Sequence, residues 1–295
     1  MNLLTQFSDA LAGRVATAAP GVAALFTDGR RVQRSALLWQ DGVLVTSEQG
    51  MPDGPAQAVL PGTGALPATL AGRDPGTNIA VFRLDSPAPS RPEPGEAVVG
   101  ALALLLGADE VGSVSARLGM VNVVGPAWTS MAGGRVDQLI RLDARLSPQE
   151  EGGPVVSASG QLLGMSTLGP RRRTLVIPTV TMERVVEALL TAGRVVRGWL
   201  GISLHPVAIP PAFQAEAAGP AGLMLMSLAR GGPAEAAGLL PGDILLALDG
   251  APVENPRAVA KALGLLPIGQ TVTLRLLRNG VVQTLTATIE VRPSC

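Results

Sequence analysis

The sequence of 295 residues contains few of the side chains on which hydrolytic and metal chemistry depends. It has one histidine (His205), one lysine (Lys261), one cysteine (Cys295) and no tyrosine. A single cysteine excludes a disulfide within the chain. No cluster of His, Cys, Asp or Glu has the spacing of zinc ligands. The sequence therefore predicts neither a metal nor another cofactor.

The sequence also lacks an excess of either charge and any long apolar run. The 23 basic residues balance the 23 acidic ones, and without a basic face or interleaved aromatic residues we expect no nucleic-acid partner. The triplet Arg171–Arg173 is either an exposed hairpin tip, which we favour, or an anion site. The longest uncharged apolar run, Ala97–Ala108, is shorter than the roughly 20 residues of a spanning helix. The first residues lack the basic and apolar regions of a signal peptide. These features predict a cytoplasmic location, or a periplasmic one if the start site is misassigned.

The sequence is instead rich in glycine and proline, with 36 and 25 residues. Between Val22 and about Val176 these residues punctuate short β-rich runs, as in an all-β barrel or sandwich. A helical spacing of apolar residues covers Leu3 to about Ala18, and a second covers Thr181–Ala192, with Gly193 as its cap. The runs that predict strands include Val22–Thr27, Ala36–Trp39, Val43–Thr46, Asn78–Leu84, Leu139–Leu142, Pro154–Ser157 and Gln161–Ser166.

Several stretches in this β-rich part are similar to one family in order and spacing. Asp143–Pro154 (DARLSPQEEGGP) resembles the D-A-x-I-N-P-G-N-S-G-G-P nucleophile loop of the HtrA/Deg trypsin-like serine proteases. Arg73–Val81 (RDPGTNIAV) resembles the segment with their catalytic aspartate, and Gly42–Gln49 (GVLVTSEQ) the one with their histidine. The resemblance implies a mostly β fold: a trypsin-like double β-barrel followed by a small α+β PDZ domain. We expect an N-terminal helix over 1–20, the protease-homology domain over 21–180, a linker helix over 181–195 and the PDZ domain over 196–292.

The resemblance places Gln49 at the position of the catalytic histidine, Asn78 at that of the aspartate and Glu151 at that of the serine. A carboxamide is not a base near neutral pH, and Glu151 has no hydroxyl to act as nucleophile. Gln149 replaces a glycine whose amide helps to form the oxyanion hole. These substitutions predict a pseudoprotease that is not an enzyme. The alternative is a hydrolase with residual or unorthodox activity, in which carboxylates near Glu151 act as acid and base.

The C-terminal part resembles an HtrA-type PDZ domain. Its motifs are Trp199–Ile202 (WLGI), which the resemblance identifies as the carboxylate-binding loop, and Gly232–Gly250, in which a helix ends at Gly238. A groove-lining helix over Pro256–Leu263 would present Val259 and Leu263. We therefore expect a peptide-binding site formed by Trp199, Leu200, Gly201, Ile202, Val259 and Leu263.

This resemblance predicts a binding, scaffold or regulatory protein. The expected partners are protein C-termini or extended peptides, and active HtrA relatives are further candidates. The family also implies a homo-oligomer, specifically a trimer. His205 is either a surface or groove residue, which we favour, or a switch or ligand.

Overall fold

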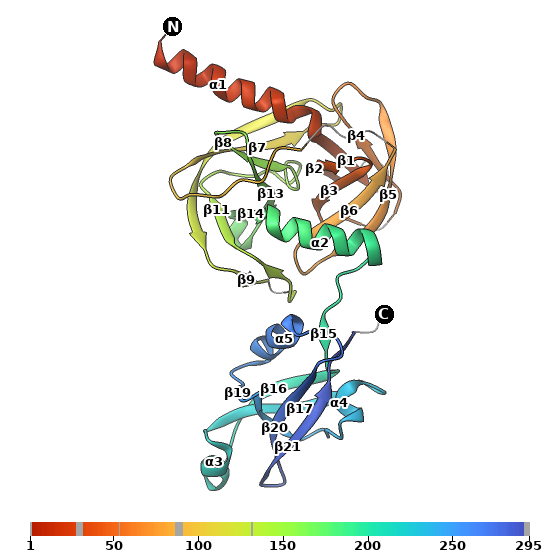
Figure 1. Cartoon of the computed structure of the whole chain (residues 1–295), viewed down its shortest axis with the longest axis vertical. Coiled ribbons are helices and arrows are strands. Elements are labelled where there is room, and N and C mark those ends of the chain that lie inside the picture. The colour runs from red at the N-terminus through yellow and green to blue at the C-terminus, as the bar shows by residue number, and fades with distance from the viewer. Residues whose placement is uncertain (1, 28–31, 53, 86–90, 131, 292–295) are drawn as a thin grey trace. The chain divides into compact units, whose positions relative to one another are not determined.

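The computed structural model describes residues 2–27, 32–52, 54–85, 91–130 and 132–291. The chain divides into two compact units, Met1–Val195 and Val196–Cys295. Figure 1 shows the barrels of the first unit and the mixed sheet and helices of the second. The predicted fold class, mostly β with a double barrel and a C-terminal PDZ domain, is confirmed.

The first unit contains two closed barrels of six strands each. The first barrel has the order β1-β2-β3-β6-β5-β4, and the second the order β11-β14-β13-β12-β7-β8. A two-stranded sheet, β9 with β10, lies outside them. The strands are β1 (Val22–Thr27), β2 (Val32–Gln40), β3 (Val43–Ser47), β4 (Ala56–Val59), β5 (Ala65–Asp74), β6 (Ile79–Leu84), β7 (Leu102–Ala108), β8 (Val114–Gly125), β9 (Trp128–Thr129), β10 (Arg135–Val136), β11 (Leu139–Leu142), β12 (Pro154–Ser157), β13 (Leu162–Leu168) and β14 (Thr174–Pro178).

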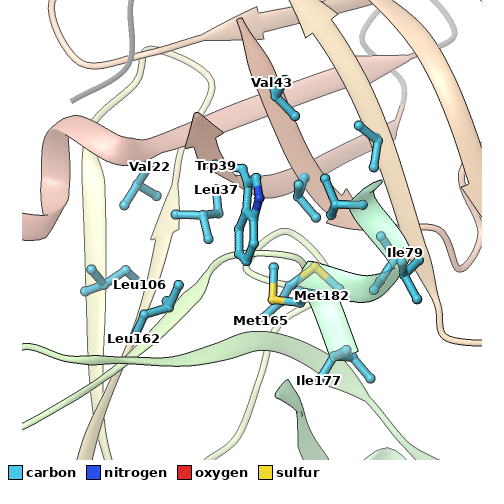
Figure 2. Close-up of a cluster of buried hydrophobic side chains, with 14 of the residues drawn as sticks. Val22, Leu37, Trp39, Val43, Ile79, Leu106, Leu162, Met165, Ile177 and Met182 are labelled. Atoms are coloured by element: carbon cyan, nitrogen blue, oxygen red, sulfur yellow. The ribbon is translucent and has the colours of Figure 1, made fainter. Parts of the chain in front are cut away.

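Several of these strands are buried on both faces, which explains their continuous apolar sequence. In β1 every residue is buried: Ala23 and Leu25 pack inside the first barrel, whereas Val22, Ala24 and Phe26 belong to another cluster. That second cluster joins the two barrels. Figure 2 shows Trp39 and Leu37 of β2 beside Leu106, Leu162 and Met165 of the second barrel and Met182 of a helix.

Four helical segments complete the described part of the first unit: α1 (Leu3–Ala18), two 3-10 turns, η1 (Ala19–Gly21) and η2 (Pro170–Arg172), and α2 (Thr179–Ala192). The side chain of Asn2 caps α1 by accepting a hydrogen bond from the Thr5 amide at 2.9 Å. Helix α2 buries Met182, Val185, Val186 and Leu189 in the cluster between the barrels. It ends at Gly193, which has a φ of +69° in the left-handed conformation that favours glycine.

The second unit has its own core and a sheet in the order β16-β17-β18-β20-β21, with β19 paired to β18. The first and last strands of this unit, β15 and β22, form a separate two-stranded sheet. The elements are β15 (Gly198–Trp199), β16 (Ile202–Ala208), α3 (Pro211–Ala217), β17 (Ala221–Leu228), α4 (Pro233–Ala236), β18 (Ile244–Leu248), β19 (Ala251–Pro252), α5 (Pro256–Leu265), β20 (Thr271–Arg278), β21 (Val281–Thr288) and β22 (Glu290–Val291).

Candidate functional site

The loop from Asp143 to Gly153 connects β11 with β12 and carries the residues that the resemblance aligns with a nucleophile loop. Its last turn is anchored to β13, because the Gly152 amide donates to the Ser166 carbonyl and the Ser166 amide donates to the Gly153 carbonyl, both at 2.9 Å. Gly153 lies so close to the Leu106 carbonyl oxygen that a Cβ atom there would clash with it. This close approach fixes the position of Glu151 relative to both barrels.

Glu151 is 2% exposed, and its carboxylate accepts from several donors. Oε1 accepts hydrogen bonds from Ser47 Oγ at 3.1 Å, from Thr167 Oγ1 at 3.0 Å and from the Leu168 amide at 3.1 Å. Oε2 lies 3.7 Å from Nε of Arg34. A buried carboxylate needs such partners, since an unpaired charge in the interior is strongly disfavoured. The donors come from β2, β3 and β13, so Glu151 connects the two barrels.

Asn78 is part of the same network. It has a φ of +60°, a left-handed conformation in which Asn is tolerated better than most residues. Its Oδ1 accepts from the Gln49 amide at 2.6 Å and lies 3.2 Å from Ser47 Oγ, whose single hydrogen it shares with Glu151. Its Nδ2 donates to Thr167 Oγ1 at 2.6 Å. The network therefore brings Gln49, Asn78 and Glu151 together through shared hydrogen bonds.

Gln49 and Gln149 take part in these contacts mainly through their backbone atoms. The Gln149 carbonyl accepts from Ser35 Oγ at 2.8 Å, and the Gln49 carbonyl accepts from Arg34 Nη2 at 3.1 Å. Both glutamines are exposed. The roles assigned to Gln49, Asn78, Glu151 and Gln149 stay predictions, because the structure shows their placement and not their function.

The other carboxylates considered for acid–base chemistry have separate partners. Glu150 accepts from Arg117 Nε at 2.7 and 2.8 Å and from the Ser147 amide at 2.9 Å, whereas Glu48 lies 3.6 Å from Arg73. Burial tends to raise the pKa of Glu150, but the hydrogen bonds from Ser147 and Arg117 outweigh it, and the pKa is lowered overall. Glu48, Glu150 and Glu151 are thus each neutralised by a different arginine and do not form a carboxylate pair.

Sequence reasoning missed three residues of this network: Arg34, Ser47 and Thr167. Serine and threonine are common in strands, so neither hydroxyl has a local signal that marks it as a ligand of a distant carboxylate. The one available clue is Glu151 itself, because a glutamate in a glycine-rich loop next to a buried strand needs a cation and hydroxyl donors. That clue predicts the kind of partner but not its position.

The predicted peptide-binding residues lie in the second unit. Gly201 has a φ of +77°, and a Cβ atom there would lie 3.0 Å from the Ala229 Cβ. The carbonyls of Leu200 and Gly201 accept from the amides of Ala234 at 3.0 Å and Ala229 at 2.8 Å. Among the loop and turn hydrogen bonds of the described residues, none is donated by the Leu200 or Gly201 amide. Trp199 is half-buried beside this loop.

The two helix residues of the predicted site are less accessible than expected. Val259 and Leu263 on α5 are 3% and 5% exposed and belong to the same core cluster as Leu200, with Ile202 and Leu204 packed against it. One helical turn separates them, so both lie on the face of α5 that packs into this cluster. The structure therefore brings the predicted residues together, with the helix side chains packed into the core.

The remaining residues singled out in the sequence are His205, the triplet Arg171–Arg173 and Cys295. His205 is exposed on β16 and Arg171–Arg173 are exposed between β13 and β14, while Cys295 lies outside the described residues. The described part of the chain contains no group of three His, Cys, Asp or Glu residues that could hold a metal ion. Within the same residues, no helix has both the length and the apolar character needed to cross a membrane.

Two six-stranded barrels, followed in the chain by a small unit of sheet and short helices, define the class of a trypsin-like peptidase domain with a PDZ domain. Residues 34–165 match the family model described as a trypsin-like peptidase domain, and residues 198–289 match that of a PDZ domain. The chain is accordingly an HtrA-like protease homologue with a PDZ domain.

Individual relatives agree with this assignment. The chain is 30% identical over 267 residues to a probable periplasmic serine endoprotease, DegP-like, of Brucella suis, covering 86% of the chain and 52% of that relative. A protein of the same description from Rhizobium meliloti is 29% identical over 266 residues, with 86% and 52% covered. The chain thus spans about half the length of these curated relatives.

Solved structures match over almost the whole chain. The HtrA-type protease AlgW with a decapeptide has a TM-score of 0.73 at 26% identity and covers 96% of this chain and 99% of its own. AlgW with a tripeptide has a TM-score of 0.71 at 28% identity, with 96% and 98% covered.

These comparisons contradict two predictions made from the sequence. The prediction that the chain is not an enzyme is contradicted because the relatives are named as serine endoproteases and the family is enzymatic. That prediction rested on three side chains, which do not by themselves remove a chain from its class. The predicted cytoplasmic location is contradicted because the curated relatives are named as periplasmic.

Proposed function

We propose that this chain binds peptides with a free, apolar C-terminus through its PDZ domain. The observation that carries the proposal is the position of β16, which is an edge strand of the sheet and pairs with β17 alone among the described strands. An edge strand presents unpaired backbone groups, and an extended peptide can add to it as a further strand. The structures of the HtrA-type protease AlgW with a decapeptide and with a tripeptide support a peptide as the class of ligand.

The loop Trp199–Ile202 would hold the terminal carboxylate. Because the carbonyls of Leu200 and Gly201 are already occupied by Ala234 and Ala229, the loop's amides are the groups left to face a ligand. Amides that converge on a carboxylate form charge-assisted hydrogen bonds, which are stronger than neutral ones. Gly201 permits this curvature, since its left-handed φ is strained for a residue with a Cβ atom.

The side chain of the last peptide residue would enter between α5 and β16. Val259 and Leu263 provide apolar surface there, and Ile202 and Leu204 are half-buried on the strand. Because Val259 and Leu263 are buried in the core cluster, the peptide side chain has to displace them slightly to gain contact. We therefore expect a small or medium apolar terminal residue to bind better than a bulky one.

Calorimetry on the full chain tests this function with two matched peptides, one with a free terminal acid and one amidated. The acid should bind at least tenfold more tightly, because each lost hydrogen bond to a charged group costs about 1.5–3 kcal/mol. Gly201→Val should abolish binding, since its Cβ would meet Ala229. Gly219→Val is the matched control, because no atom lies within 4 Å of a Cβ there. Equal affinity for acid and amide would disprove the carboxylate loop.

We further propose, from the resemblance, that the chain works as a scaffold or regulator in the periplasm. Active HtrA relatives are candidate partners there, and the chain itself would form a homo-oligomer, specifically a trimer. Helix α1 supports assembly, since Leu3, Leu4 and Phe7 are 80%, 76% and 44% exposed and the helix has no buried residue. Sedimentation of the full chain, compared with a Leu4→Ser and Phe7→Ser double variant, tests this: a trimer that the variant dissociates is expected, and a wild-type monomer would contradict it.

Hydrolysis is the second candidate function, because it is the activity named for the relatives. The observation that favours it is the contact of Ser47 Oγ with the Glu151 carboxylate at 3.1 Å, since a hydroxyl beside a base is the pairing used in nucleophilic catalysis. Against it, Ser47 is fully buried and Glu151 is shared among several donors. The test is cleavage of an unfolded substrate protein by the wild type, Ser47→Ala and Glu151→Gln. Cleavage lost in both variants would establish this mechanism, and cleavage unchanged in both would exclude it.

A further inference from the structure

The second barrel carries an open pocket of about 500 Å³ whose charge is unusual for a chain with no net charge. Four arginines and one aspartate line it, so the pocket has an excess of three positive charges. The arginines are Arg141, Arg145, Arg172 and Arg173, and the acid is Asp143. We call it the arginine pocket. It is formed by strands β8 and β11, the start of the Asp143–Gly153 loop and the end of the β13–β14 connection.

Three of the four arginines have no partner within the part of the chain that the structure describes. Arg145, Arg172 and Arg173 are exposed, and neither a hydrogen bond nor an ion pair of their guanidinium groups occurs among the described residues. Arg141 donates Nε to Asn122 Oδ1 at 3.0 Å, which orients its guanidinium at the pocket wall. By contrast, Arg34, Arg117, Arg135 and Arg184 in the same unit all have an acidic partner.

The backbone that presents these arginines is strained. Arg171 and Arg172 have φ values of +58° and +55°, although glycine or asparagine adopts this left-handed region far more readily. The connection is closed by the Gly169 amide, which donates to the Arg173 carbonyl at 2.8 Å. Thr174 Oγ1 donates to the Ala144 carbonyl at 2.6 Å and so fixes the connection against the loop. Like charges gathered on a strained backbone are a feature of functional sites, which makes this pocket a candidate binding site.

We propose that the arginine pocket binds carboxylate side chains of an acidic peptide segment. This proposal rests on the proposed function in that it takes a peptide as the ligand. Guanidinium groups bind carboxylates bidentately. Asp143 among the arginines disfavours a compact dianion such as phosphate, whereas carboxylates spaced along a peptide can each reach an arginine. No aromatic side chain lines the pocket, so it offers no platform for stacking nucleobases.

The experiment uses the full chain and fluorescence anisotropy. The probe is a short labelled peptide in which glutamates alternate with glycine and serine, acetylated and amidated at its ends so that the PDZ loop has no free carboxylate to hold. Its twin carries glutamine for every glutamate. We expect the glutamate peptide alone to bind, and to weaken as salt is raised because exposed charges are screened.

Three variants with the same loss of charge locate the site. Arg145→Gln and Arg173→Gln should each weaken binding about tenfold, as expected for the loss of a hydrogen bond to a charged group. Arg171→Gln is the matched control, since Arg171 belongs to the same connection but does not line the pocket. All three side chains are exposed, so the variants should fold. Gly201→Val should leave this binding unchanged, which separates it from failure of the PDZ function.

Three outcomes would overturn the proposal. Equal binding of the two peptide twins would show that carboxylates are not recognised. An equal loss in Arg171→Gln and Arg173→Gln would show a general effect of charge rather than a pocket. Tighter binding of inorganic phosphate or of a single-stranded oligonucleotide, with the same dependence on Arg145 and Arg173, would assign the pocket to another class of ligand.

Discussion

Glu151 is a buried anion whose partners come from three strands, and its side chain therefore contributes to the stability of the first unit. Glu151→Ala leaves the guanidinium of Arg34 without its anion and leaves Thr167 Oγ1 and the Leu168 amide without their acceptor, while Ser47 Oγ keeps only Asn78 Oδ1. We expect a loss of about 3 kcal/mol in the free energy of unfolding, measured with urea. Glu110→Ala, at an exposed glutamate, is the control. A loss no larger than that of the control would show that the network is unimportant.

Two half-buried carboxylates predict how stability depends on pH. Burial raises the pKa of Glu150, whereas hydrogen bonds from Ser147 and Arg117 lower it. The net effect is a pKa below its ordinary value of 4.5. For Asp137, burial is likewise outweighed by Arg184 and Thr181, and its pKa falls below 3.8. A carboxyl with a lowered pKa stabilises the folded state above its unfolded pKa, and this contribution is lost as the pH falls through its folded pKa.

Stability should therefore decrease as the pH falls below about 4.5. Urea unfolding at neutral pH and at about pH 3 would measure the decrease in the wild type and in a Glu150→Gln, Asp137→Asn double variant. The double variant should be less stable at neutral pH and should lose less on acidification. If its loss equals that of the wild type, other groups govern the acid response.

At the scale of single residues, the sequence predicts which residues lie in the candidate site better than it predicts which side chains they contact. Gln49, Asn78 and Glu151 are distant in the chain, and the structure does bring them into one network. The residues that satisfy the carboxylate were not predictable, because Ser47 and Thr167 lie on different barrels and contact Glu151 only after both barrels close.

At the scale of elements, the apolar pattern determines most boundaries. The helix predicted over Leu3–Ala18 and the strands over Val22–Thr27 and Leu139–Leu142 have these bounds in the structure. Strands buried on both faces give short, continuous apolar runs that local turn signals delimit well. The α5 helix extends to Leu265, two residues beyond the prediction. Its packing was not predictable, because a period of four places Val259 and Leu263 on one face without saying how deep that face lies.

At the scale of the whole molecule, each unit has hydrophobic clusters of its own. The clusters around Trp39, Phe82 and Ile140 lie within residues 1–195, and those around Leu274 and Ile209 within residues 196–295. The order of the two units follows from the motifs in the sequence, and the closure of two barrels follows from the resemblance. No local pattern of residues predicts the closure of a barrel, because closure requires strands that lie far apart in the chain to pair.

Separate cores predict that the two units unfold in separate transitions. Glu151→Ala should lower the melting temperature of the first unit alone, by about 2–4 °C per kcal/mol lost. Asn255→Ala should act on the second unit alone, because the Asn255 side chain caps α5 by accepting from the Ala258 amide at 2.8 Å. Loss of such a cap costs about 1 kcal/mol, or about 4–8 °C in a domain of this size. Scanning calorimetry of the full chain, and of residues 1–195 and 196–295 apart, would assign each transition. A single transition that both substitutions shift would mean that the units fold as one.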